Sequence, residues 1–131
     1  MFTGIPHSEI DAVWPVIAPW IGEACLRAKG RYDAEDVRQW LLKRDWQLWV
    51  FYDPEIIACC CTEIVDYPQK RYCRVAMAAG AGLHKWARHM QTIESWAISK
   101  GCHGMELGGR LGWKRIFPEW ENNNLFLEKE F

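Results

Sequence analysis

The sequence predicts a single α/β domain, residues 1–131, in which helices flank a mixed β-sheet. Two stretches with helical apolar spacing come first, and three aromatic or β-branched stretches joined by short turns follow them. A further helical stretch then separates the third strand from a fourth. Strands joined by short turns should form an antiparallel meander, whereas a helical crossover should place the fourth strand parallel to its neighbour.

The first helix is expected over residues 9–28, where apolar residues recur on one face. Ser8 and Asp11 have the spacing of a capping box at its start. Pro15 and Pro19 each remove a backbone hydrogen bond and crowd the preceding turn, so a kinked helix is expected.

The second helix is expected over about residues 34–44, because Asp33 and Asp36 can cap its first turn. The following strands are aromatic, β-branched or cysteine-rich and are separated by Pro-containing turns. They are expected over residues 46–52, 56–65 and 71–77.

From Leu83 the apolar period becomes helical, and this main helix should end at Lys100-Gly101. A fourth strand is expected over 103–107, followed by a short helix over 111–117 and a final strand over 125–131. The edge of that final strand would be available for pairing in a homodimer.

The most informative local feature is Ala78–Gly82, which joins the strand 71–77 to the main helix. A glycine-rich turn between a strand and a helix can direct backbone N–H groups at an anion, usually a phosphate. Small residues at such a turn also serve tight packing, so the pattern alone leaves both roles open.

The charges are nearly balanced, with 16 basic and 17 acidic residues and a formal net charge of −1. This balance gives no general attraction to nucleic acid or to an anionic membrane, and neither partner is expected. Small basic groups, such as the one formed by Lys70, Arg71 and Arg74, are expected to be solvated. No apolar run reaches the length of a bilayer, so a cytoplasmic protein is expected.

The six cysteines are expected to be buried structural thiols. Cys59, Cys60 and Cys61 are consecutive in a predicted strand, where their side chains must alternate between the two sheet faces. They cannot converge on one metal ion from one side, and no metal site is expected.

The order of elements, with the glycine turn before the main helix, resembles the GNAT N-acetyltransferase superfamily, and in particular small GNAT-like proteins of bacteriophages. The resemblance covers about residues 8–131. It implies an acetyltransferase that uses acetyl-CoA as cosubstrate and transfers the acetyl group to an amine, on a small molecule or a protein. A phage-encoded protein would act in the host cytoplasm.

The same resemblance assigns the cosubstrate-binding residues to the glycine turn and the start of the main helix: Met77, Ala78, Ala79, Gly80, Ala81, Gly82, Leu83 and Lys85. Met77 stands where the family has Gln or Arg, and residues 111–117 lack the tyrosine that many members use as a general acid. These departures keep a second reading open, namely a catalytically inactive GNAT-fold binding protein that acts on a host or virion protein.

Transfer of an acetyl group to an amine also needs a base. The candidates are Glu63, Asp66 and Glu106, all on or beside predicted strands. Glu63 is the first choice, because its strand pairs with the strand that leads into the glycine turn. An exposed strand carboxylate is the simpler role for Glu63, and a structural ion pair is the simpler role for Glu106.

Overall fold

A computed structural model describes residues 1–82, 87–108, 117–121 and 128–131 of the chain. Short 3₁₀ turns at His7–Glu9, Leu26–Ala28 and Ala87–His89 adjoin the helices. The helices and strands are, in chain order, β1 (Phe2–Ile5), α1 (Ile10–Cys25), α2 (Ala34–Leu42), β2 (Trp46–Tyr52), β3 (Ile56–Asp66), β4 (Arg71–Gly80), α4 (Met90–Ser99) and β5 (Gly104–Leu107).

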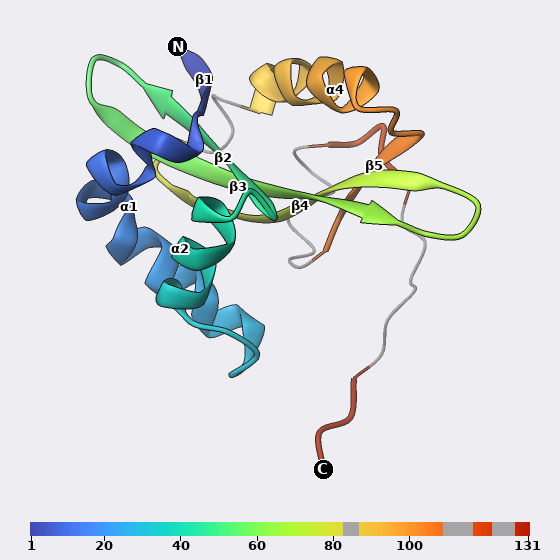
Figure 1. Ribbon diagram of the computed structural model, residues 1–131, viewed down its shortest axis with the longest axis horizontal. Coiled ribbons are helices and arrows are strands. Elements are labelled where there is room, and N and C mark those ends of the chain that lie inside the picture. Colours follow the sequence, from blue (N-terminus) through green and yellow to red (C-terminus); the bar gives the residue numbers. More distant parts are fainter. Residues whose placement is uncertain (83–86, 109–116, 122–127) are drawn as a thin grey trace.

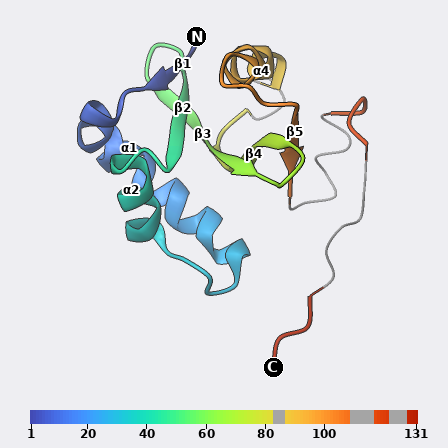
Figure 2. The same ribbon diagram turned by 45° about the vertical axis from the view of Figure 1, so that its right-hand side comes forward.

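The strands form one five-stranded sheet in the order β1-β2-β3-β4-β5. The first four are antiparallel to their neighbours, and β5 is parallel to β4. Helices α1 and α2 cover one face of this sheet, and α4 covers the other (Figures 1 and 2). The predicted α/β fold is therefore confirmed, with its meander and its helical crossover to a parallel strand.

Each face of the sheet carries its own apolar core, because side chains alternate along a strand. On the α1 and α2 face, Ile17 and Ile21 pack with Cys59, Cys61 and other buried residues. On the α4 face the core includes Ile93, Ala97, Cys60 and Cys73. The cysteines of β3 thus fill both cores as small apolar side chains, as expected from their alternation.

The starts of the two N-terminal helices differ in how well the sequence predicts them. Asp33 and Asp36 each accept a hydrogen bond of 3.0 Å from the other's backbone N–H, so the predicted cap of α2 is confirmed. The capping box expected at Ser8 is wrong. A 3₁₀ turn begins after Pro6, with Glu9 N–H bonded to the Pro6 carbonyl at 2.9 Å, and α1 starts only at Ile10 without a side-chain cap.

Two strand boundaries also differ from the prediction. β1 was not expected, and it exists through its pairing with β2, from Phe2 opposite Phe51 to Ile5 opposite Leu48. β4 continues three residues past the expected end at Met77, because its last three residues pair with the backbone of Ala58, Cys59 and Cys60 on β3.

The C-terminal predictions fall mostly outside the described residues. Residues 83–86, 111–116 and 125–127 belong to that part, so the start of the main helix, most of the short helix and half of the final strand are not placed. Residues 128–131 are described, and they are not in a strand. In the residues that are described, no helix is both long enough and apolar enough to span a membrane.

Candidate functional site

Strands β4 and β5 diverge partway along their length. Their pairing runs from Tyr72 opposite Gly104 to Val75 opposite Leu107, where β5 ends. β4 continues to Gly80. Within the described residues, the edge of β4 beyond Val75 therefore has no strand beside it on the β5 side. Backbone N–H and C=O groups on such an edge are available to a ligand.

A β-bulge lies at the point of divergence. Thr62 pairs with Val75 and Cys61 pairs with Met77, so Ala76 is an extra residue on β4. As a result Ala76 and Met77 both pack toward the α1 and α2 face. A bulge of this kind bends the strand and changes the direction of its backbone groups, which is common beside ligand sites.

A cavity of about 190 Å³ opens beside this bulge. One wall is β4 from Arg74 to Ala78, and Leu107 and Gly108 at the end of β5 form a second wall. The third wall comes from the C-terminal end of α1 and the segment after it, through Ala24, Arg27, Ala28 and Tyr32. The small side chains of Ala76 and Ala78 leave the strand backbone close to this space.

The floor beside the cavity is a row of polar side chains across four strands. Glu63 on β3 lies opposite both Trp46 on β2 and Arg74 on β4, and Arg74 lies opposite Glu106 on β5. The Glu63 carboxylate accepts a hydrogen bond from Trp46 Nε1 at 2.9 Å and one from Arg74 Nη1 at 3.1 Å. Both of its oxygens are therefore engaged by donors.

Arg74 is the centre of this row. Its Nε donates to Glu106 at 3.0 Å, its Nη2 lies 2.9 Å from the same carboxylate, and Nη2 also donates to the Tyr67 hydroxyl at 3.3 Å. Burial opposes its charge, but the attraction of Glu106 and Glu63 outweighs this, so the pKa of Arg74 is raised. Arg74, which was expected to be solvated, is only partly exposed, because β3, β5 and the turn between β3 and β4 supply it with acceptors.

Tyr32 and Arg27 are the other polar side chains on the cavity wall, and Tyr32 is held in place by aromatic contacts. Its ring packs edge-on against Trp40 and Trp46, with centroid distances of 5.3 and 5.7 Å, and these contacts fix its position. No hydrogen-bond partner for its hydroxyl occurs among the described residues. Burial, with the nearby Cys25, Cys61 and Glu63, raises the pKa of Tyr32, so the hydroxyl keeps its proton at neutral pH.

The eight residues expected to bind the cosubstrate fall into four pairs. Met77 and Ala78 line the cavity. Ala79 and Gly80 pair with Cys59 and Ala58 on β3. The glycine turn itself is thus shorter than expected.

Beyond the strand, the Ala81 N–H donates to the Ile57 carbonyl at 2.8 Å, and Gly82 follows with a φ of +68°. Leu83 and Lys85 lie outside the described residues. The role of this segment in binding an anion therefore stays a prediction. The Ala81 N–H would not take part in it, because it already donates to Ile57.

The three candidate bases are all ion-paired. Glu63 and Glu106 share Arg74, and Asp66 lies 2.6 Å from Arg71 Nε. The structural pairing expected for Glu106 is confirmed, whereas the catalytic role of Glu63 stays a prediction. Among the residues that the structure describes, no cluster of His, Cys, Asp and Glu could hold a metal ion.

Sequence reasoning missed Arg74, Tyr67 and Tyr32. A signal for Arg74 was present, since a cation between apolar residues of a central strand needs a partner on the neighbouring strand. Finding that partner required the register of β3 against β4, including the bulge. Tyr32 carried no such signal, because only the packing of the α1–α2 segment against the sheet brings it to the cavity.

No protein-family model and no curated protein matches the sequence. Solved structures do. A probable acetyltransferase superposes with a TM-score of 0.72 at 10% identity, over 100% of this chain and 97% of that one.

A predicted acetyltransferase with acetyl-CoA from Clostridium acetobutylicum superposes with a TM-score of 0.69 at 12% sequence identity, over 99% of this chain and 95% of that one. A GNAT family acetyltransferase from Staphylococcus aureus superposes with a TM-score of 0.64 at 11% sequence identity, over 100% of this chain and 98% of that one. The chain thus has the fold of GNAT acetyltransferases.

Proposed function

We propose that this protein is an N-acetyltransferase that takes the acetyl group from acetyl-CoA and transfers it to an amine. The observation that carries the proposal is the open edge of β4 at the bulge, next to a cavity that Ala76, Met77 and Ala78 line. The GNAT fold supports it, because structures with this fold include acetyltransferases, one of them with acetyl-CoA.

The chain's own groups suit the acyl end of the cosubstrate. Acetyl-CoA would supply a thioester, whose carbonyl must be polarised during attack by the amine. In this proposal, a backbone N–H group on the open edge of β4, near Met77 or Ala78, donates a hydrogen bond to that carbonyl. For the diphosphate, the available backbone begins at Gly82, since the Ala81 amide is bonded to Ile57.

The reaction also needs two proton transfers. As the amine nitrogen bonds to the acetyl carbon, the carbon–sulfur bond breaks and its electron pair leaves on sulfur. Glu63 is the proposed acceptor of the amine proton, with Arg74 or Trp46 giving up one hydrogen bond to it. Tyr32 is the proposed donor to the thiolate, in place of the tyrosine that residues 111–117 lack.

Calorimetry with acetyl-CoA and with free CoA tests binding, and release of the CoA thiol in the presence of a panel of amines tests turnover. We expect binding of both, and turnover that Glu63→Gln lowers while Glu55→Gln, in the exposed β2–β3 turn, does not. Absence of acetyl-CoA binding up to the high micromolar range would remove the proposal.

A second candidate is a GNAT-fold binding protein without catalysis. The occupied Ala81 amide and Met77, in place of a polar residue, favour it. In that case CoA or its acetyl ester would bind weakly or not at all, and no amine in the panel would be acetylated. The turnover experiment with the amine panel would also identify whether the acceptor is a small amine or a protein.

A further inference from the structure

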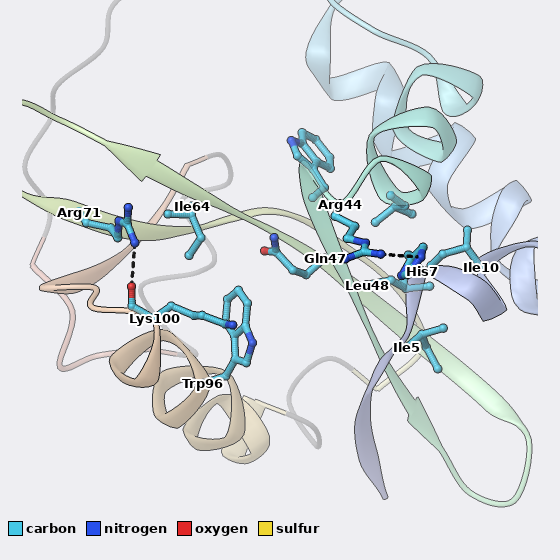
Figure 3. A pocket seen from close by; sticks show the side chains of 12 residues that line it. Ile5, His7, Ile10, Arg44, Gln47, Leu48, Ile64, Arg71, Trp96 and Lys100 are labelled. Atoms are coloured by element: carbon cyan, nitrogen blue, oxygen red, sulfur yellow. Dashed lines mark hydrogen bonds between the residues drawn. The ribbon is translucent and has the colours of Figure 1, made fainter.

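A second and larger cavity, of about 360 Å³, is shown in Figure 3. It shares no lining residue with the first. It is centred on the first residues of β2. β1 ends at Ile5 opposite Leu48, so Trp46 and Gln47 extend beyond the last β1 pair. The cavity occupies this free edge of the sheet and continues over the C-terminal end of α4.

Buried hydrogen bonds fix the orientation of the Gln47 amide. Trp49 Nε1 donates to the Thr62 hydroxyl at 3.0 Å, and that hydroxyl donates to Gln47 Oε1 at 2.9 Å. Thr62 is completely buried, so it has no water to bond instead. With its oxygen held by Thr62, the Gln47 side chain presents its NH₂ group, a pure donor, to the cavity that it lines.

The charged groups around this amide are all cations. Lys100 extends past Trp96 on one side and Arg71 lies beyond Ile64, whereas Arg44 lies on the other side of Gln47 with its guanidinium directed at His7 (Figure 3). No carboxylate is among the described residues that line the cavity. A cavity whose polar lining donates hydrogen bonds and carries positive charge is suited to an anion.

Two of these cations are available to a ligand. Arg71 is occupied, because it is bonded to Asp66 and donates to the Lys100 carbonyl at 2.9 Å. The Arg44 guanidinium lies 3.1 Å from the His7 ring nitrogen, and no salt bridge joins Arg44 or Lys100 to an acidic residue among those that the structure describes.

Arg44 is also one of only two described non-glycine residues with a positive φ, at +67°. This conformation is unfavourable for arginine and belongs to the C-terminal cap of α2, in which the backbone N–H groups of Arg44 and Asp45 donate to the carbonyls of Leu41 and Trp40 at 3.2 and 2.9 Å.

We propose that this cavity binds a small organic anion, a carboxylate or phosphate carried on an aromatic or aliphatic body. The oxyanion would accept hydrogen bonds from Lys100, Arg44 and the Gln47 amide. The body would lie against the apolar wall that includes Trp96 and Ile64. The volume is in the range of small-ligand sites and suits a molecule of one ring. The proposal does not depend on the acetyltransferase function, because Gln47, Arg44 and Lys100 have no part in the proposed reaction.

The test uses benzoate and phenyl phosphate as probes and benzamide as their uncharged counterpart. Binding is followed by the NMR shift of the Trp96 indole N–H in the intact chain. Lys100→Met and Arg44→Asn remove the two charges, and asparagine tolerates the left-handed backbone at position 44. Lys43→Met is the matched control, since Lys43 is exposed and does not line the cavity.

We expect both anions to bind, benzamide to bind at least about tenfold more weakly, and each of the two variants to lose roughly tenfold in affinity. The control should bind like the unchanged protein, and thermal unfolding should show that all variants are folded. A preference for benzoate or for phenyl phosphate would identify the oxyanion. Equal binding of benzamide, equal affinities of Lys100→Met and Lys43→Met, or no shift at Trp96 would overturn the proposal.

Discussion

Replacing Gly80 by alanine should be the most damaging of the glycine-to-alanine changes in the described part of the chain. Gly80 has a φ of +105°, which side-chain-bearing residues rarely adopt. A Cβ at this position would lie 2.5 Å from the Ile57 carbonyl oxygen and 2.6 Å from the Ala58 Cα. Both are backbone atoms of β3, so neither can rotate away, and the ends of β3 and β4 would have to separate.

Substitutions at two other glycines separate the cost of the positive φ from the cost of overpacking in the free energy of unfolding. Gly101 also has a positive φ, +79°, but a Cβ there would meet nothing within 4 Å, so Gly101→Ala should cost only about 1–2 kcal/mol for the backbone conformation. Gly22 lies in α1 with open space around it, and Gly22→Ala should stabilise by about 0.5–1 kcal/mol. Gly80→Ala adds overpacking to the backbone cost, giving roughly 2–5 kcal/mol in total.

Urea unfolding followed by tryptophan fluorescence measures all three free energies on one scale. The reasoning fails if Gly80→Ala costs no more than Gly101→Ala, because the close approach of β3 would then contribute nothing. The result also decides how the glycine turn can be studied. A bulky or charged residue at position 80 would disturb the sheet first, so loss of acetyl-CoA binding by such a variant would not identify a phosphate site.

Four further predictions concern the polar row, the cavity wall and the thiols. Arg74→Met leaves Glu63 and Glu106 without the cation that they share and should lower the free energy of unfolding by about 1–3 kcal/mol in urea titrations. An unchanged free energy of unfolding would refute the role of the row. Tyr32→Phe should lower kcat about 100-fold with little change in acetyl-CoA affinity measured by calorimetry, and an unchanged kcat would exclude it as the proton donor.

Burial raises the pKa of Cys59 and of Cys73 from 9.0 to about 12, so the folded state favours the neutral thiols. Their contribution to stability should be complete below pH 9 and decline as the pH rises towards 12, which urea titrations across this range would detect. At neutral pH, iodoacetamide should modify the partly exposed Cys102 before any other cysteine, and mass spectrometry of the modified peptides would show a different order if the burial pattern were wrong.

Local chemistry was sufficient to predict most of the sheet. The cap of α2 depends only on Asp33 and Asp36, three residues apart, and its geometry is the same in any protein. The meander depends on short turns between apolar stretches, which leave adjacent antiparallel pairing as the simplest arrangement. In both cases the interacting groups are close in the sequence, so no knowledge of the tertiary structure was needed.

The errors arose where distant segments decide the conformation. The four residues of β1 have no strand signal of their own and become a strand by pairing with β2. The end of β4 is set by partners on β3 and by the lack of space at Gly80. The same reason explains the site, because Arg74, Glu63 and Glu106 become neighbours only in the correct register, which includes the bulge at Ala76.

The position of this bulge changes which part of the cosubstrate the proposal depends on. The sequence directs attention to the backbone amides near Gly80, as donors to a diphosphate. In the structure Gly80 pairs with Ala58 in the sheet, and the Ala81 N–H donates to the Ile57 carbonyl. The Ala81 amide is therefore not available to a diphosphate.

The open edge of β4, by contrast, has no such competing role in the described residues and lies beside Tyr32, Arg74 and a cavity. A backbone N–H can polarise a thioester carbonyl whatever side chain the residue carries. Having Met at position 77, where the GNAT family has Gln or Arg, should therefore weaken the binding of acetyl-CoA more than it slows the acetyl transfer. It follows that weak binding of acetyl-CoA together with measurable turnover is the outcome most consistent with this geometry.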